Sequence, residues 1–210
     1  MEPHGGQPIV TAGVALGESP TVMIMVHGRG AAPRNILDLV PRLNRQGFTY
    51  LAPAAANNTW YPYSFMADTA KNEPGLSSAL DVLDRLVKDV VARGVRKDHI
   101  VLLGFSQGAC LTSEFAVRHA DRYGGVILFT GGLVGPPGTT WSNPGSFAGT
   151  PVFLGSSDPD PHVPKDRVDE SAAVFTRMGA AVTERIYQGM GHTINDEEIV
   201  YAQAVMDGVP

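Results

Sequence analysis

Six short runs of hydrophobic residues recur along the chain and predict six β-strands, at 21–26, 48–52, 100–103, 126–130, 152–154 and 182–187. Most of these runs are hydrophobic at every position and do not alternate with polar residues. Such runs are typical of strands that are covered on both faces in a largely parallel sheet. A weaker stretch at 9–16 predicts an antiparallel strand at the edge of the sheet.

Segments with helical periodicity lie between the predicted strands. The clearest covers 76–93, where leucine and valine residues recur at spacings of three or four, and Arg93 followed by Gly94 marks its C-terminus. Weaker patterns cover 35–46, 109–118, 166–178 and 195–206. Because strands and helices alternate, we predict an α/β fold with a mostly parallel central sheet and helices on both faces. Ligand sites in such folds lie at the C-terminal ends of the strands.

Length and composition fit one α/β domain over residues 1–210. The chain is 43% hydrophobic and 18% charged, and a chain of this length buries roughly 70% of its unfolded surface without needing disulfides. The single cysteine, Cys110, excludes an internal disulfide, and we interpret it as a buried, inert thiol. Two long segments rich in proline, glycine, asparagine and aromatic residues, 54–74 and 131–150, are the expected places for a pocket.

The charge pattern argues against a nucleic-acid partner. With 16 Lys and Arg residues against 21 Asp and Glu residues, the net charge is −5 and the isoelectric point is about 5.6. The hydrophobic runs are far shorter than the ~20 residues that span a bilayer. The N-terminal sequence M-E-P-H-G-G-Q-P lacks the pattern of a signal peptide. We therefore expect a cytoplasmic protein without a membrane span that acts on a small molecule, as a monomer or a homodimer.

The motif G-F-S-Q-G at 104–108 is the strongest chemical signal in the sequence. It directly follows the predicted strand 100–103 and directly precedes a helical pattern, which is the context of a nucleophile elbow. In such a turn the serine has a strained backbone, and the glycines two residues before and after it leave space for the turn. The N-terminus of the following helix favours negative charge at a developing oxyanion. This context predicts Ser106 as a nucleophile.

A serine nucleophile needs a histidine that takes its proton. His192 lies in the glycine-rich sequence G-M-G-H-T after the predicted strand 182–187, so it can reach the C-terminal edge of the sheet. By contrast, His4 belongs to the N-terminal tail, His99 precedes a strand and His119 lies near the end of a helix. We therefore predict that His192 is the base.

The third group is a carboxylate that orients the histidine. The segment after the strand 152–154 reads G-S-S-D-P-D-P-H-V-P and offers Asp158 and Asp160. The order serine, acid, histidine along the chain is the order of the α/β-hydrolase fold. We expect one aspartate to orient His192 and the other to form an Asx-type turn before proline.

Stabilising an oxyanion requires two converging N–H donors. One is the backbone N–H of Gln107, directly after the nucleophile, and the other is expected from the sequence V-H-G-R-G at 26–30, where Arg29 supplies its backbone N–H. We interpret His27 as a structural loop residue and the Arg29 side chain as solvated. A phosphate-binding loop is not indicated, because the lysine and hydroxyl residue of a P-loop are missing.

The aromatic segment W-Y-P-Y-S-F-M at 60–66 is the expected pocket lining. Trp60 and Tyr61 are our candidates for substrate contact, since apolar pockets are commonly built from such side chains. The alternative is a small hydrophobic cluster beneath the loop. Leu133, after the strand 126–130, is a further candidate, with Trp141 or Phe147 beside it.

No metal and no other cofactor is predicted. Asp158, Asp160 and His162 are residue types that bind metals. Their spacing within a proline-rich turn matches neither a zinc nor a calcium site.

Four motifs in order resemble one family: H-G-R-G at 27–30, G-F-S-Q-G-A at 104–109, D-P-H-V-P at 160–164 and G-M-G-H at 189–192. Over residues 20–205 the chain resembles the phospholipase/carboxylesterase branch of the α/β-hydrolases, which includes small bacterial carboxylesterases and acyl-protein thioesterases. The resemblance implies an eight-stranded core, no large cap domain and short- or medium-chain acyl esters as substrates. It also implies that the aspartate of D-x-x-V-P, Asp160, is the acid. Arg29 and the segment 60–66 depart from the family pattern.

These observations predict a serine carboxylesterase that uses Ser106, His192 and Asp160, with the Arg29 and Gln107 amides at the oxyanion. A lysophospholipase or an acyl-protein thioesterase is the alternative within the same class. A dienelactone-type hydrolase is disfavoured, because it is expected to use a cysteine where this chain has Ser106. An α/β-hydrolase fold that only binds a ligand is the alternative outside the enzymes, and it has no physical need for all three side chains.

Overall fold

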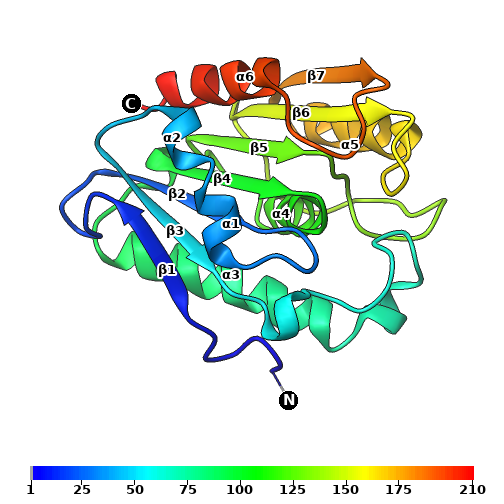
Figure 1. Cartoon of the computed structure of the whole chain (residues 1–210), viewed down its shortest axis with the longest axis horizontal. Helices are drawn as coiled ribbons and strands as arrows, with labels where there is room; N and C mark the ends of the chain where they lie inside the picture. The colour runs from blue at the N-terminus through cyan, green and yellow to red at the C-terminus, as the bar shows by residue number, and fades with distance from the viewer. Residues whose placement is uncertain (1) are drawn as a thin grey trace.

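The hydrophobic runs form the strands of one sheet, which Figure 1 shows at the centre of the molecule. In the computed structural model, which describes residues 2–210, the seven strands lie in the order β1-β3-β2-β4-β5-β6-β7. Every neighbouring pair is parallel except β1 and β3, which are antiparallel. The strands are β1 Ile9–Gly13, β2 Thr21–Val26, β3 Phe48–Pro53, β4 Ile100–Phe105, β5 Gly125–Phe129, β6 Pro151–Asp158 and β7 Ala181–Gln188.

All six predicted strands and the predicted antiparallel edge strand are confirmed. The resemblance implied eight strands, whereas residues 2–210 form a sheet of seven, because a single strand, β1, precedes β2 in the chain. The sheet is mostly parallel, as expected from the alternation of strands and helices.

The helices are α1 Pro33–Leu37, α2 Val40–Leu43, α3 Gly75–Ala92, α4 Gln107–Arg118, α5 Lys165–Arg177 and α6 Asp196–Asp207. The single helix predicted over 35–46 is wrong, because the structure divides it into α1 and α2. Pro41 lies in the first turn of α2 and has no N–H to continue the hydrogen bonding of α1. The other predicted helices are confirmed, and α3 is followed by Arg93 at its C-cap and by Gly94 at a φ of 91°.

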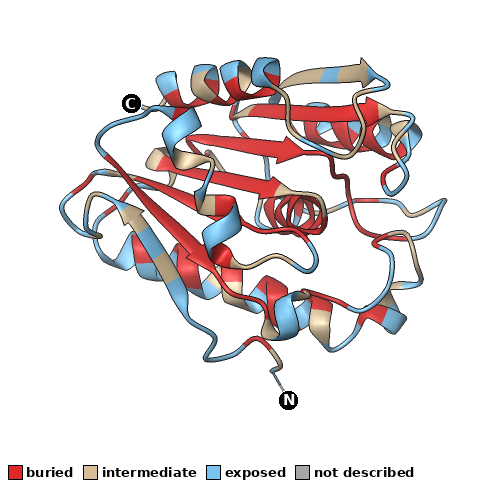
Figure 2. Cartoon of the chain, viewed as in Figure 1, coloured by how far each residue is buried: buried red, intermediate tan, exposed pale blue. Residues whose placement is uncertain are grey.

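Helices cover both faces of the sheet, which explains why the strands are hydrophobic at every position. Along β2, Val22 and Ile24 pack into a cluster with α3, α4 and α5, while Met23 and Met25 pack into a second cluster with α1, α2 and α6. Successive side chains of a strand point to opposite faces of the sheet. Each buried strand therefore needs apolar residues at its odd and its even positions. Figure 2 shows that the central strands are buried and that the edge strands β1 and β7 are more exposed.

Between residues 2 and 210, no helix is both long and apolar enough to span a lipid bilayer.

Candidate active site

Ser106 lies in the sharp turn between β4 and α4. Its backbone has φ 55° and ψ −121°, a conformation that side-chain-bearing residues rarely adopt. A methyl group on Gly104 would overlap the carbonyl of Gly108, and one on Gly108 would overlap the carbonyl oxygens of Val26 and His27. Both glycines of the motif are therefore needed for the close approach of α4 to the ends of β4 and β2, as the sequence predicted.

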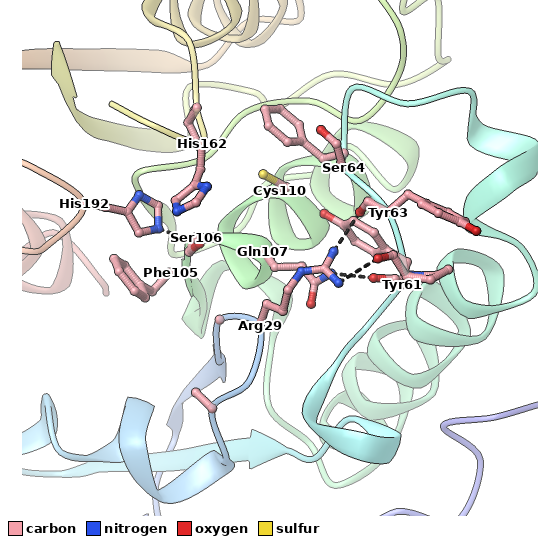
Figure 3. A pocket seen from close by; sticks show the side chains of 15 residues that line it. Arg29, Tyr61, Tyr63, Ser64, Phe105, Ser106, Gln107, Cys110, His162 and His192 are labelled. Carbon is pink, nitrogen blue, oxygen red and sulfur yellow. Dashed lines mark hydrogen bonds between the residues drawn. The ribbon is translucent and has the colours of Figure 1, made fainter. Parts of the chain in front are cut away.

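The structure brings Ser106, His192 and Asp160 into one hydrogen-bonded chain. They follow β4, β7 and β6, respectively, and meet at the C-terminal edge of the sheet. The His192 Nε2 lies 2.8 Å from the Ser106 Oγ, and the His192 Nδ1 lies 2.9 Å from the Asp160 Oδ2. With the proton of the neutral imidazole on Nδ1, Nδ1 donates to the carboxylate and Nε2 accepts from the serine hydroxyl. Figure 3 shows His192 beside Ser106 at one end of a cavity.

Asp160 holds its position through both carboxylate oxygens. While Oδ2 binds His192, Oδ1 accepts from the backbone N–H groups of His162 and Val163, each at 2.8 Å. Burial acts to raise the pKa of the Asp160 carboxyl, but these backbone hydrogen bonds and the bond from His192 outweigh it and hold the pKa below its usual value. Asp160 is therefore an ionised acceptor for the histidine at neutral pH.

The expected division of roles between the two aspartates is wrong. Asp160 is hydrogen-bonded to His192 and also makes the Asx-type contacts to the backbone that follows it. Asp158 ends β6, and its Oδ2 lies 3.5 Å from the Gln188 Nε2. The difference arises because the chain turns after β6, which directs only the Asp160 side chain toward His192.

Of the two residues predicted to supply the oxyanion donors, Gln107 directly follows Ser106 and Arg29 lines the same cavity as Ser106. Gln107 is the first residue of α4, where a helix has no internal acceptor for its N–H, and Arg29 belongs to the loop after β2. Within the described part of the chain, neither the Arg29 N–H nor the Gln107 N–H has a backbone acceptor.

The side chains of the same two residues hold the segment 60–66, which we call the aromatic loop. The Gln107 Oε1 accepts from the Trp60 N–H at 3.0 Å, and its Nε2 donates to the Tyr61 carbonyl at 2.8 Å. The Arg29 guanidinium donates to the Pro62 carbonyl at 2.8 Å and to the Tyr63 carbonyl at 2.7 Å. The expectation of a merely solvated Arg29 side chain is wrong, because consecutive carbonyls of the aromatic loop face it.

A cavity of about 450 Å³ opens beside Ser106, and we call it the first cavity. Arg29 and Tyr61 line it (Figure 3), together with Phe65 of the aromatic loop. His162 and Phe105 flank His192: the centroids of their rings lie 4.9 Å and 5.3 Å, respectively, from that of His192. Both residues lie within the motifs at 104–109 and 160–164, but no pattern in the sequence assigned them to the pocket.

Trp60 and Leu133 do not line this cavity, and both predictions of substrate contact are corrected. Trp60 is fully buried beneath the aromatic loop, where its Nε1 donates to the His27 carbonyl at 2.9 Å. Leu133 is fully buried in the core, and its carbonyl accepts from the Arg167 guanidinium at 2.8 Å. Trp141 borders a different hollow and Phe147 is fully buried, so neither of them joins Leu133 at the site.

Two buried histidines support the start of the long segment 54–74. The His27 Nε2 accepts from the Ala55 N–H at 3.2 Å, which confirms its structural role. His4 is also buried, with Nδ1 accepting from the Ala56 N–H at 3.0 Å and Nε2 donating to the Trp60 carbonyl at 2.8 Å. The assignment of His4 to a tail is therefore wrong. Burial lowers the pKa of both imidazoles, so both are neutral at pH 7.

Cys110 is buried one helical turn after Ser106, as predicted. Burial raises the pKa of its thiol to about 12, which leaves almost no thiolate at neutral pH. Among residues 2–210, no group of three His, Cys, Asp or Glu side chains is arranged to hold a metal ion.

Comparison with known proteins gives the family. The sequence profile of the family described as Phospholipase/Carboxylesterase matches residues 15–207. The chain belongs to this family. A crystal structure of a phospholipase/carboxylesterase from Dyadobacter fermentans is similar with a TM-score of 0.94 and 42% identity, covering 98% of each chain.

Two further relatives are less similar in sequence than the protein from Dyadobacter fermentans. An acyl-protein thioesterase 1 from Eremothecium gossypii is 28% identical over 170 residues, which cover 74% of this chain and 71% of that protein. A probable carboxylesterase SOBER1-like protein from Arabidopsis thaliana is 23% identical over 201 residues, which cover 88% of this chain and 77% of that protein. The predicted family, the α/β-hydrolase fold without a large cap and the class of ester hydrolases are thereby confirmed.

Proposed function

We propose that the protein is a serine carboxylesterase that hydrolyses short- to medium-chain acyl esters through Ser106, His192 and Asp160. The observation that carries this proposal is the hydrogen-bonded chain from the Ser106 Oγ through His192 to the Asp160 carboxylate, at 2.8 Å and 2.9 Å. This arrangement has the geometry of a nucleophile, a base and a group that orients the base.

Acylation begins when the Ser106 Oγ attacks the ester carbonyl carbon and its proton passes to the His192 Nε2. The carbonyl oxygen becomes an oxyanion that accepts from the Arg29 and Gln107 N–H groups, and Asp160 stabilises the imidazolium. The carbon–oxygen bond to the alcohol then breaks, and His192 returns the proton to the departing alkoxide. The products of this half-reaction are the free alcohol and an acyl-Ser106 ester.

Deacylation repeats the same steps with water. His192 takes a proton from the water molecule, the resulting hydroxide attacks the acyl carbon, and the second oxyanion occupies the same position. When the bond to the Ser106 Oγ breaks, His192 gives the proton back to the serine. The carboxylic acid leaves and the enzyme returns to its initial state.

The proposed acyl length rests on the first cavity. Its volume of about 450 Å³ lies at the small end of the range for ligand pockets, roughly 300–1,000 Å³. Its aromatic wall is held by four hydrogen bonds, three donated by the Arg29 and Gln107 side chains and one accepted by the Gln107 Oε1. A fixed wall favours small acyl groups over chains that need a long groove.

We expect p-nitrophenyl acetate or butyrate to be hydrolysed with a higher kcat/KM than p-nitrophenyl palmitate. The measurement is the initial rate across the series from acetate to palmitate. A maximum at palmitate would contradict the proposed acyl length and favour lipid or acyl-protein substrates. The similarity to an acyl-protein thioesterase makes thioester hydrolysis the second candidate, which an S-acylated peptide assayed beside the oxygen ester tests directly.

We further expect Arg29→Ala to lower kcat by about tenfold, equivalent to ~1.4 kcal/mol. The substitution keeps the backbone N–H that is proposed to bind the oxyanion. It removes the hydrogen bonds to the Pro62 and Tyr63 carbonyls, which fix the positions of the aromatic loop and the Arg29 backbone relative to each other. Arg34→Ala, on the exposed surface of α1, is the matched control and should leave kcat unchanged.

The double variant Arg29→Ala/Gln107→Ala distinguishes a shared support from two separate effects. Since both side chains hold the same loop, their effects on kcat should be less than additive in free energy. Strict additivity would show that the two side chains act independently. An unchanged kcat in Arg29→Ala would show that its hydrogen bonds to the aromatic loop do not contribute to catalysis.

A further inference from the structure

A second cavity of about 400 Å³ adjoins the first. The two cavities share Gly28, Ala31, Phe105 and His192, so these residues form the border between them. In Figure 3, Phe105 and His192 lie at one end of the first cavity, while Tyr61 and Tyr63 lie at the other end. The second cavity therefore begins where the first one ends, at the base.

The two cavities differ in which reacting groups they contain. The first is lined by the nucleophile Ser106 and by both residues that supply the oxyanion donors, Arg29 and Gln107. The second is lined by His192 and the two residues that follow it, and it contains neither the nucleophile nor either oxyanion donor.

The stereochemistry of the tetrahedral intermediate assigns the two cavities to different halves of the ester. The reacting carbon carries the Ser106 Oγ, the oxyanion, the acyl chain and the alcohol oxygen. The alcohol oxygen must lie within hydrogen-bond distance of the His192 Nε2, because that atom protonates it. The alcohol portion consequently extends past His192, and the acyl chain extends away from it along the aromatic loop.

We propose that the second cavity binds the alcohol portion of the ester and selects apolar alcohols, an inference that rests on the proposed function. Its side walls are the aliphatic side chains of Ile36, Leu39 and Ile194. Leu39 and Ile194 are only partly buried and pack against the cluster beneath α1 and α6, so they leave apolar surface for a ligand to cover.

The charge at the rim of the second cavity also favours a neutral alcohol. Arg42 is the cation that lines the cavity, and its guanidinium is paired with the Asp196 carboxylate at 2.8 Å. A pair of opposite charges attracts an anionic alcohol less than a free guanidinium does. The aliphatic walls then dominate the selection.

The kinetics of an acyl-enzyme separate the two cavities. The alcohol leaves at the end of acylation, so a change in its binding site alters acylation and leaves deacylation of a common acyl-enzyme unchanged. A change in the acyl site alters both steps.

The test uses esters with one acyl group and different alcohols. We expect the wild-type enzyme to hydrolyse n-hexyl acetate with a kcat/KM roughly tenfold above that of methyl acetate. Leu39→Trp should weaken or remove this preference, because the larger indole group takes up part of the second cavity. The deacylation rate constant, measured after the burst with p-nitrophenyl acetate, should stay at the wild-type value.

Two further variants test the same assignment of the cavities without relying on Leu39→Trp alone. Leu39→Ala should also weaken the preference for the hexyl ester, because the smaller side chain loses apolar contact with the hexyl group instead of blocking the second cavity. Ser64→Trp, at an exposed position lining the first cavity, adds similar bulk on the other side and should change the dependence on acyl length but not on the alcohol.

Equal rates for the methyl and hexyl esters in the wild type would overturn the inference and leave the proposed function standing. A Leu39→Trp enzyme that changes acyl-length preference and keeps its alcohol preference would assign the second cavity to the acyl chain instead. If the wild-type enzyme hydrolysed no ester or thioester, the proposed function and this inference would both be overturned.

Discussion

Ser106→Ala is expected to lower kcat for p-nitrophenyl acetate by about 10⁶-fold, the loss found when the nucleophile of a comparable triad is removed. The His192 Nε2 would have no hydroxyl at 2.8 Å from which to take a proton, and no acyl-enzyme would form. The proposed oxyanion donors are backbone groups that the substitution does not remove, so the residual rate should report what they contribute alone.

The Ser106→Ala experiment needs a folded variant and a matched serine elsewhere. The thermal transition of Ser106→Ala should stay at or above that of the wild type, because alanine removes the hydroxyl but not the backbone turn. Ser142→Ala, at an exposed position in the segment 131–150, should keep full activity. Wild-type-like hydrolysis by Ser106→Ala would show that another group is the nucleophile. A wild-type chain whose Ser106 is not labelled by a fluorophosphonate would favour a protein that only binds its ligand.

Asp160→Asn is expected to lower kcat by about 10⁴-fold. The backbone N–H groups of His162 and Val163 both point at the Oδ1 and will hold the amide oxygen of the asparagine there. The amide NH₂ then faces the His192 Nδ1, which must become an acceptor, and the imidazole proton moves to Nε2. An imidazole with its proton on Nε2 cannot accept the serine proton, so the variant is folded but holds the wrong tautomer.

Asp158→Asn is the matched control for Asp160→Asn, because it makes the same chemical change two residues earlier. The Asp158 carboxylate reaches Gln188 at 3.5 Å and makes no contact with His192, so kcat should change by no more than a few fold. The comparison is kcat for one ester in the two variants at the same pH. Equal losses would contradict the assignment of Asp160 as the acid.

The fold was predictable from sequence because its signals are local. The β2 and β4 runs need apolar residues on both faces, since helices cover both sides of the sheet, and this requirement appears directly as unbroken hydrophobic segments. The prediction of one helix over 35–46 failed for an equally local reason, since Pro41, in the first turn of α2, has no N–H to continue the hydrogen bonding of α1.

The site residues were predictable from sequence where the position of a residue in the fold determines where its side chain points. Ser106 sits between a strand and a helix, and the glycines around it are needed for that packing, so sequence alone locates it. His192 follows the last strand and must lie at the same edge. Neighbouring loop residues had no such constraint: Tyr61 lines the cavity, whereas Trp60 points beneath the loop to bind the His27 carbonyl.

The sequence by itself therefore determined the order of the strands and helices along the chain and located Ser106 and His192, the proposed nucleophile and base, since these depend on hydrophobic periodicity and on glycines at fixed spacing. Only the tertiary structure decided that Asp160 both binds His192 and caps its own turn, and that Arg29 holds carbonyls more than thirty residues away. The tertiary structure also revealed the second cavity, whose walls come from the segment that contains α1 and α2 and from the loop after β7. The physical reason is that the direction of a side chain in a loop is set by contacts with distant segments, and the identity of its neighbours in the chain does not encode those contacts.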